Sequence, residues 1–121
     1  MGSDRSTILV IDDDAIIRSF FAEVLRREHQ VIECGEGAKA VELFEADGRD
    51  RYDLVLLDLG MPHMSGYEAL AKLQIMDPDV KVLVVTGLVP DQERLPGVVL
   101  ILQKPVGVDQ LLDAVRSALD A

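Results

Sequence analysis

Carboxylate, hydroxyl and ammonium side chains follow four separate apolar runs of this 121-residue sequence. Asp12 to Asp14 come directly after the first run and Asp58 after another, while Thr86 and Lys104 follow the two later runs. An acidic, oxygen-rich cluster suits a hard divalent cation, and Mg²⁺ binds through one or two carboxylates together with waters and phosphoryl oxygens. If the fold brings them together, these residue types predict Mg²⁺-dependent phosphoryl chemistry.

The apolar runs alternate with stretches of helical period, which is typical of a parallel sheet with helical crossovers. Helices are expected after each of the first three runs and after the last. Between residues 85 and 98, Pro90, Pro96 and Gly97 interrupt the period, so at most one short helical turn is expected there. The expected strands are residues 7–11, 30–34, 53–57, 80–85 and 98–102. The sequence therefore predicts an α/β fold, a doubly wound five-stranded parallel sheet with helices on both faces.

The carboxyl ends of parallel strands are where such sheets bind ligands. Asp12, Asp13, Asp58, Thr86 and Lys104 are all expected at that edge. Carboxylates there repel one another by about 4 kcal/mol per pair at 4 Å and an effective dielectric constant near 20, so a cation is needed among them. Asp58 stands alone on its strand and is the expected nucleophile. Lys104 offers a point charge and Thr86 a hydroxyl donor to a newly formed acyl phosphate.

Size and charge restrict the function further. The length suits a single domain over residues 1–121, with a core of about 6–120. With 22 acidic and 12 basic residues the net charge is −10, which disfavours direct binding to nucleic acid or to an anionic membrane. Cys34 is the only cysteine and the first residues do not resemble a secretory signal, so a cytoplasmic location is expected.

Four runs in the order ILVIDDD, LVLLDLGMPHMSG, VLVVTG and LQKPV resemble a response regulator receiver domain, the CheY-like module of two-component systems. The resemblance implies a flavodoxin-like sheet with strand order 2-1-3-4-5. It implies that Asp58 accepts phosphate from a histidine kinase or histidine phosphotransferase. It also implies that Mg²⁺ is held by Asp12, Asp13, Asp58 and the backbone carbonyl of Gly60, and that Thr86 and Lys104 contact the phosphoryl group. The Lys104–Pro105 peptide bond is expected to be cis.

The sequence departs from the family pattern in the segment from Thr86 to Lys104. An aromatic residue is common three places before the lysine, but Ile101 stands there. The segment is also short, as in receivers attached to hybrid histidine kinases. Nothing before Thr7 or after Ala121 is expected to act as an effector, so the output is expected through another protein or another part of a longer chain.

Two positions that tune phosphate lifetime in this family are Gly60, two places after the acceptor, and Leu88, two places after the threonine. Neither side chain is polar, so neither can orient an attacking water. Leu88 is expected to shield the site. The sequence therefore predicts slow self-hydrolysis of the aspartyl phosphate.

Other functions remain as alternatives. A haloacid-dehalogenase-like phosphatase would use Asp12 as nucleophile and Asp14 as acid, but no later acidic pair follows a strand and there is no room for a cap domain. An FMN binder would need a phosphate loop free of anions. A pseudo-receiver scaffold that is never phosphorylated is the third. We expect a signalling switch that turns over no separate substrate.

Several residues have simpler interpretations than chemistry. Asp14 is explained as the N-cap of the first helix and is left out of the metal ligands. His63 is expected in an exposed loop, and Cys34 is expected to be a small buried hydrophobe. The charged exterior of the first helix, Arg18, Arg26 and Arg27, is expected to be solvated, although in this family the phosphodonor docks beside it.

Overall fold

The computed structural model describes residues 5–48 and 50–121, so residues 1–4 and 49 of the predicted domain lie outside the description. The described chain forms a five-stranded parallel sheet in the order β2-β1-β3-β4-β5, which confirms the predicted fold class. The strands are β1 (Thr7–Ile11), β2 (Gln30–Cys34), β3 (Leu54–Leu57), β4 (Val82–Thr86) and β5 (Leu100–Gln103). The helices are α1 (Ala15–Leu25), α2 (Gly37–Asp47), α3 (Gly66–Met76) and α4 (Val108–Leu119), with a short 3₁₀ turn, η1 (Gln92–Arg94).

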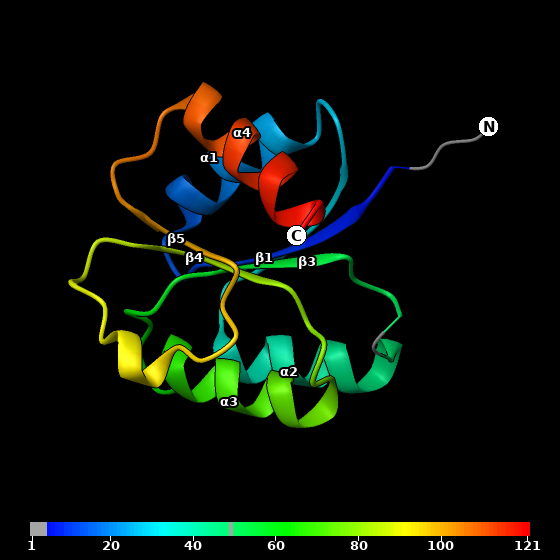
Figure 1. Ribbon diagram of the computed structural model, residues 1–121, viewed down its shortest axis with the longest axis vertical. Coiled ribbons are helices and arrows are strands. Elements are labelled where there is room, and N and C mark those ends of the chain that lie inside the picture. Colours follow the sequence, from blue (N-terminus) through cyan, green and yellow to red (C-terminus); the bar gives the residue numbers. More distant parts are fainter. Residues whose placement is uncertain (1–4, 49) are drawn as a thin grey trace.

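Helices cover both faces of the sheet: α1 and α4 on one, α2 and α3 on the other (Figure 1). All five residues of the interior strand β1 are buried, as its continuous apolar run requires. Side chains of a strand alternate between the two faces, so Ile8 and Val10 join the core under α1 and α4. Leu9 and Ile11 join the core under α2 and α3. The sheet is therefore held between two apolar layers.

Three strands begin later than predicted. β3 begins at Leu54, and Asp53 before it exchanges two hydrogen bonds with Thr7: its N–H donates to the Thr7 carbonyl and its carboxylate accepts from the Thr7 N–H, both at 2.8 Å. The N–H of Val80 donates to the carbonyl of Asp77, so Val80 belongs to the turn that closes α3. The N–H of Val98 makes a similar turn bond to Leu95 before β5 begins. Thr86 is the last residue of β4 rather than the first after it.

The helix termini follow their capping residues. Asp14 caps α1, because its side chain accepts hydrogen bonds from the N–H groups of Ile16 and Ile17, as predicted. Ser65 and Glu68 form a capping box at the start of α3. In α1, Phe21, Val24 and Leu25 are buried, whereas Phe20 is 39% exposed. Phe20 lines an open groove at the margin of the helix, where no described segment covers it.

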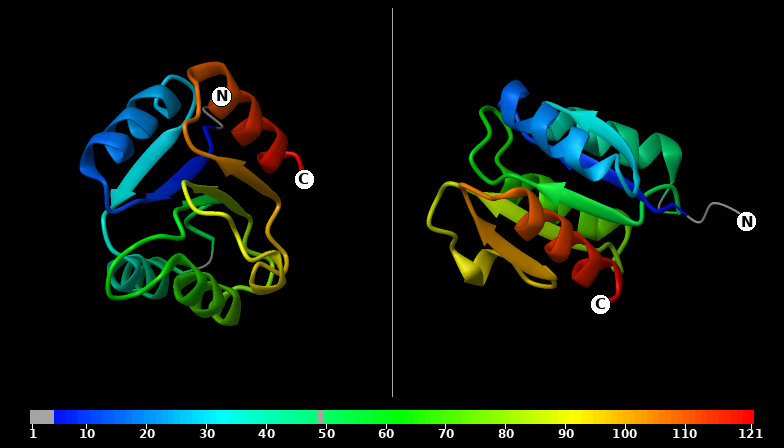
Figure 2. Two further views of the ribbon diagram at one scale, coloured as in Figure 1. Left: turned by 90° about the vertical axis from the view of Figure 1, so that its left-hand side faces the viewer. Right: turned by 90° about the horizontal axis from the view of Figure 1, so that it is seen from above.

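The connection between β4 and β5 contains only η1, which confirms the short helical turn expected there. The backbone N–H of Asp91 donates to the hydroxyl of Tyr67 at 2.8 Å, and the Arg94 guanidinium lies 4.0 Å from the centre of the Tyr67 ring. These contacts hold η1 beside α3 (Figure 2). Ile101 of β5 packs against the core on the same face of the sheet. Among the described helices, none has the length and apolar character needed to cross a membrane.

His29, in the connection between α1 and β2, makes the stability of the fold dependent on pH. His29 is 8% exposed, and within the described chain neither of its ring nitrogens has a hydrogen-bond partner. Burial lowers the pKa of His29, and the nearby Glu28 carboxylate opposes this only in part. As the pH is lowered, the unfolded chain therefore binds a proton at His29 before the folded state does.

The pKa of His29 is lower in the folded state than in the unfolded chain. The free energy of unfolding is therefore highest above the unfolded pKa of about 6.5 and falls as the pH drops below that value. Urea unfolding at pH 7.5 and pH 5 should show a decline of the order of 1 kcal/mol that His29→Leu reduces, the size typical of one titrating group. An equal decline in both proteins would contradict this account.

Candidate functional site

The predicted site residues meet at the carboxyl edge of the sheet. Asp12 follows β1, Asp58 follows β3, Thr86 ends β4 and Lys104 follows β5. Carboxylate oxygens of Asp12, Asp13 and Asp58 all lie within 4.8 Å of one another. The ammonium nitrogen of Lys104 lies 2.8 Å from an Asp12 oxygen and 3.8 Å from an Asp58 oxygen. Sheet topology thus gathers groups that are far apart in the sequence.

Two of the three carboxylates are buried: Asp12 is 2% exposed and Asp58 is 8% exposed, whereas Asp13 is exposed. Burial, and then repulsion from Asp12, raise the pKa of Asp58; Lys104 and the N–H of Gly60 oppose this, and Asp13 adds to the repulsion. The charged form of Asp58 is therefore held at a cost in free energy.

The donor set fits a hard divalent cation. Three carboxylate oxygens grouped this closely repel one another unless a cation shares them. Mg²⁺ prefers oxygen ligands and tolerates a site with few protein groups, because it retains waters. Asp13 is exposed to solvent, so waters can reach an ion held by its carboxylate. Among the described residues, this is the group of metal-ligating side chains that the geometry supports.

Thr86 is fully buried, and its hydroxyl oxygen accepts a hydrogen bond from the backbone N–H of Leu88 at 3.1 Å. The hydroxyl proton remains available to another acceptor. The N–H of Lys104 donates to the Thr86 carbonyl at 2.8 Å, which continues the pairing of β4 with β5. Thr86 and Lys104 are therefore fixed to each other through the backbone.

The loop after Asp58 depends on Gly66. A Cβ atom at Gly66 would lie 2.2 Å from the Asp58 carbonyl oxygen and 2.6 Å from the Leu59 Cα, so no larger residue fits. The N–H of Gly66 donates to the carbonyl of Leu59. This contact returns the chain to the end of β3 and closes the loop beside the acceptor carboxylate. The Lys104–Pro105 peptide bond is cis, as expected.

Arg18 is a site neighbour that the sequence did not reveal. It was predicted to lie on a solvated face, but its side chain is only 21% exposed. Its guanidinium donates to the Asp12 carbonyl at 2.8 Å and to a Glu33 carboxylate oxygen at 3.3 Å. Arg18 therefore ties the loop bearing Asp12 to the neighbouring strand β2. The contact of Arg18 with Glu33 depends on β2 lying next to β1. The spacing of residues along α1 gives no information about that pairing.

The remaining side chains match their simpler interpretations. His63 is an exposed loop residue with a positive φ of 67°. Cys34 is buried, and burial raises the pKa of its thiol. Asp14 serves the α1 N-terminus instead of the carboxylate cluster. None of these residues belongs to the metal-ligating group found in the described chain.

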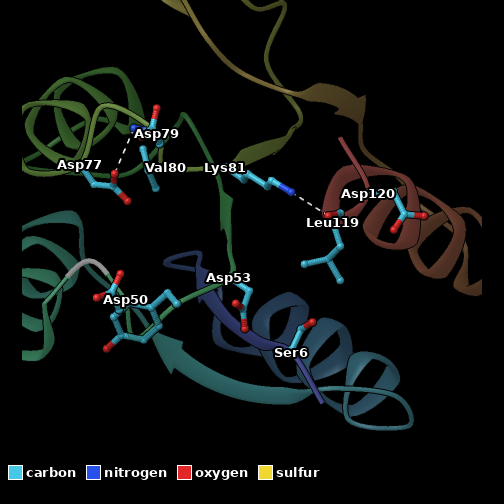
Figure 3. A pocket seen from close by; sticks show the side chains of 10 residues that line it. Ser6, Asp50, Asp53, Asp77, Asp79, Val80, Lys81, Leu119 and Asp120 are labelled. Atoms are coloured by element: carbon cyan, nitrogen blue, oxygen red, sulfur yellow. Dashed lines mark hydrogen bonds between the residues drawn. The ribbon is translucent and has the colours of Figure 1, made fainter. Parts of the chain in front are cut away.

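A separate hollow of about 430 Å³ lies at the opposite edge of the sheet, near the amino ends of the strands (Figure 3). Several aspartates line it, and Lys81 points across it to donate to the Leu119 carbonyl at 2.7 Å. The lysine thereby satisfies the carboxyl end of α4. This hollow is remote from the site at the carboxyl edge.

A doubly wound sheet with acidic groups and a lysine at its carboxyl edge defines a class of α/β proteins suited to phosphoryl chemistry. The sequence profile described as the response regulator receiver domain matches residues 8–116, and the chain belongs to this family. It is thus a phosphoryl-accepting receiver of two-component and phosphorelay signalling, as its sequence indicated.

Individual relatives agree with the family. The chain is 30% identical over 118 residues to sporulation initiation phosphotransferase F of Bacillus subtilis (strain 168), covering 93% of this chain and 92% of that protein. It is also 30% identical to the probable transcriptional regulatory protein TcrX of Mycobacterium tuberculosis, of which it spans 49%. A CheY-like receiver domain protein from Methanospirillum hungatei JF-1 superimposes with a TM-score of 0.87 at 26% identity, covering 97% of this chain and 95% of the other.

Removing the buried charge of Asp58 should stabilise the fold in the absence of metal. The pKa of Asp58 is raised in the folded state, so its charged carboxylate lowers the free energy of unfolding at neutral pH. This loss of stability disappears as the pH falls below the unfolded pKa of about 3.9, because the carboxyl is then neutral in both states. Asp58→Asn should raise the free energy of unfolding at pH 7 in EDTA by about 1 kcal/mol. Urea unfolding measures this, with the exposed Asp109→Asn as control. A loss of stability in Asp58→Asn would refute this cost of the charge.

Proposed function

We propose that Asp58 is the phosphoryl acceptor and that Asp12, Asp13, Asp58 and the backbone carbonyl of Gly60 hold Mg²⁺. The observation that carries the proposal is the position of Asp58, buried in the carboxylate cluster and 3.8 Å from the Lys104 ammonium. Bound Mg²⁺ would offset the charge of the phosphoryl oxygens and of the carboxylates. Asp58 supplies the carboxylate oxygen that forms a bond to phosphorus. The phosphorus–nitrogen bond of a phosphohistidine donor breaks, and its electron pair stays with the imidazole.

Differences in hydrogen bonding support Asp58 over Asp12 as the nucleophile. One Asp12 oxygen pairs with Lys104 at 2.8 Å, and the other accepts the N–H of Asp14 at 2.9 Å. Asp58 has only longer contacts, at 3.8 Å to Lys104 and at 3.4 Å to the N–H of Gly60. The Asp58 oxygens therefore make weaker polar contacts than the Asp12 oxygens and are more available to attack phosphorus. The same difference argues against the phosphatase alternative based on Asp12.

Lys104 and Thr86 stabilise the product in this proposal. The ammonium of Lys104 already lies between Asp12 and Asp58, so a short movement brings it to a phosphoryl oxygen on Asp58. The Thr86 hydroxyl has a free proton to donate to a second oxygen. Both groups lie on the β4–β5 side of the site, so phosphorylation changes the forces on that side of the sheet.

We propose that residues 1–121 act as one receiver unit that switches partners and turns over no separate substrate. A new phosphoryl charge at Asp58 shifts an equilibrium in the segment from Thr86 to Lys104, which another protein then recognises. The net charge of −10 disfavours nucleic acid or membrane as that direct partner. The lone buried thiol of Cys34 suits a reducing cytoplasmic location.

Incubation with acetyl phosphate and Mg²⁺ tests the acceptor. The intact mass should rise by one phosphoryl group, because acetyl phosphate carries a phosphoryl group that a carboxylate can accept. The gain should disappear with Asp58→Asn and on addition of EDTA. The exposed helix-capping Asp14→Asn serves as control and should retain the gain. Phosphate on Asp12, found by peptide mapping, would favour the phosphatase; no phosphate on the unaltered chain would favour the pseudo-receiver.

We also propose where the phosphohistidine donor docks. An apolar groove of about 400 Å³ lies between α1 and the segment after β5, lined by Ile17, Phe20, Phe21, Lys104, Pro105 and Val106. Beside it, Ile16 is 83% exposed. Because Lys104 borders both the groove and the carboxylates, a donor seated there has its histidine close to Asp58. The groove therefore suits the apolar face of a helical donor domain.

Docking is tested by comparing two exposed isoleucines. Ile16→Ser should slow transfer from a phosphorylated histidine phosphotransferase by about tenfold, the cost of losing one buried aliphatic contact. Ile75→Ser is the matched control, because Ile75 is 81% exposed on α3, on the other face of the sheet. Transfer from acetyl phosphate should be unchanged in both variants. Equal slowing by the two substitutions would reject the groove as the docking site.

A further inference from the structure

Leu88 is held at three points next to the site. Its N–H donates to the Thr86 hydroxyl oxygen at 3.1 Å, and its carbonyl accepts from the side-chain amide of Gln103 at 2.9 Å. Its side chain packs over Gly60, since a Cβ atom built on Gly60 would lie 3.2 Å from a Leu88 methyl carbon. The N–H of Gly60 in turn contacts the Asp58 carboxylate. The Leu88 side chain, which is 49% exposed, thus lies against the exposed Gly60, whose N–H touches the acceptor.

Little else restrains this part of the chain. A Cβ atom at Gly87 would meet nothing within 4 Å, and Val89 is 90% exposed. Within residues 87–90, the described hydrogen bonds are the two made by Leu88. The next contacts with α3 begin at Asp91. Within the described chain, Thr86 and Gln103 are therefore the two side chains outside residues 87–90 that hydrogen-bond Leu88, and Gln103 alone binds its carbonyl.

Gln103 is also well placed to sense the site. It ends β5 and directly precedes Lys104, while Leu88 lies two residues after Thr86. The bond between Gln103 and Leu88 thus joins the two segments that carry the proposed phosphoryl-binding groups. The side chain of Gln103 is exposed and contributes nothing to the apolar core.

We propose that Gln103 is a positioning residue that lengthens the life of the aspartyl phosphate by holding Leu88 over Gly60. The inference rests on the proposed acceptor role of Asp58. The step that Leu88 slows is hydrolysis, in which a water oxygen attacks phosphorus. The bond to Asp58 then breaks, its electron pair returns to the carboxylate, and inorganic phosphate and a proton leave. When Gln103 no longer holds the Leu88 carbonyl, the Leu88 side chain can move away from Gly60, and water then reaches the phosphoryl group.

The experiment is a double-mutant cycle on phosphate lifetime. The chain is loaded with acetyl phosphate and Mg²⁺, freed of donor, and followed by intact mass. Gln103→Ala should shorten the lifetime by about two- to tenfold, the range that one hydrogen bond corresponds to. Leu88→Ala should shorten it at least as much, and the double variant no further. Gln110→Ala, an exposed glutamine on α4, is the matched control and should leave the lifetime unchanged.

Two results would overturn the inference: an unchanged lifetime in Gln103→Ala, or a Gln103→Ala effect of equal size when Leu88 is already alanine. A second measurement needs no phosphate. The Leu88 amide should exchange its hydrogen faster in Gln103→Ala than in the unaltered chain, and equal exchange would refute the restraint. If the unaltered chain takes up no phosphoryl group, the acceptor role fails and the lifetime role fails with it. Faster exchange in that case would still show that Gln103 restrains Leu88.

Discussion

Repulsion among carboxylates at one edge of the sheet is the constraint around which the rest of the structure is arranged. At an effective dielectric constant near 20, two such charges 4 Å apart repel by about 4 kcal/mol. Asp12 and Asp58 are nevertheless buried, and within residues 5–48 and 50–121 the ammonium group of Lys104 is the one that lies close to both. The site is consequently poised to bind cations, and a change in the charge of Asp58 alters the balance of forces on its neighbours.

The fold can hold this unfavourable arrangement because its apolar layers and loop contacts fix the backbone around it. The buried strands β1 and β3 place Asp12 and Asp58 side by side. Arg18 holds the Asp12 backbone, and the absence of a side chain at Gly66 lets its loop close against Asp58. The stability of the two cores therefore maintains a geometry that the charged groups alone would not adopt.

The β4–β5 side of the site differs in character from the acidic side. Thr86 and Lys104 are joined through the backbone, whereas Leu88 is held by two hydrogen bonds and by packing over Gly60. Ile101, at the position where an aromatic residue is common in the family, is partly buried and packs against the core. The hydrogen bond from Gln103 joins the end of β5 to the loop that carries Leu88, an arrangement suited to respond to the phosphorylation proposed at Asp58.

The sequence by itself predicted the parallel sheet and the edge at which Asp12, Asp13, Asp58 and Lys104 come together, because continuous apolar runs and the residues after them are local features. The strand order was implied by the resemblance to receiver domains. The tertiary structure alone decided the contacts of Arg18 and Gln103 and the exposure of Phe20. Arg18 depends on Glu33 of a neighbouring strand, Gln103 on a carbonyl fifteen residues away, and Phe20 on which segments cover α1. Contacts between distant segments arise from packing, which periodicity along one element does not encode.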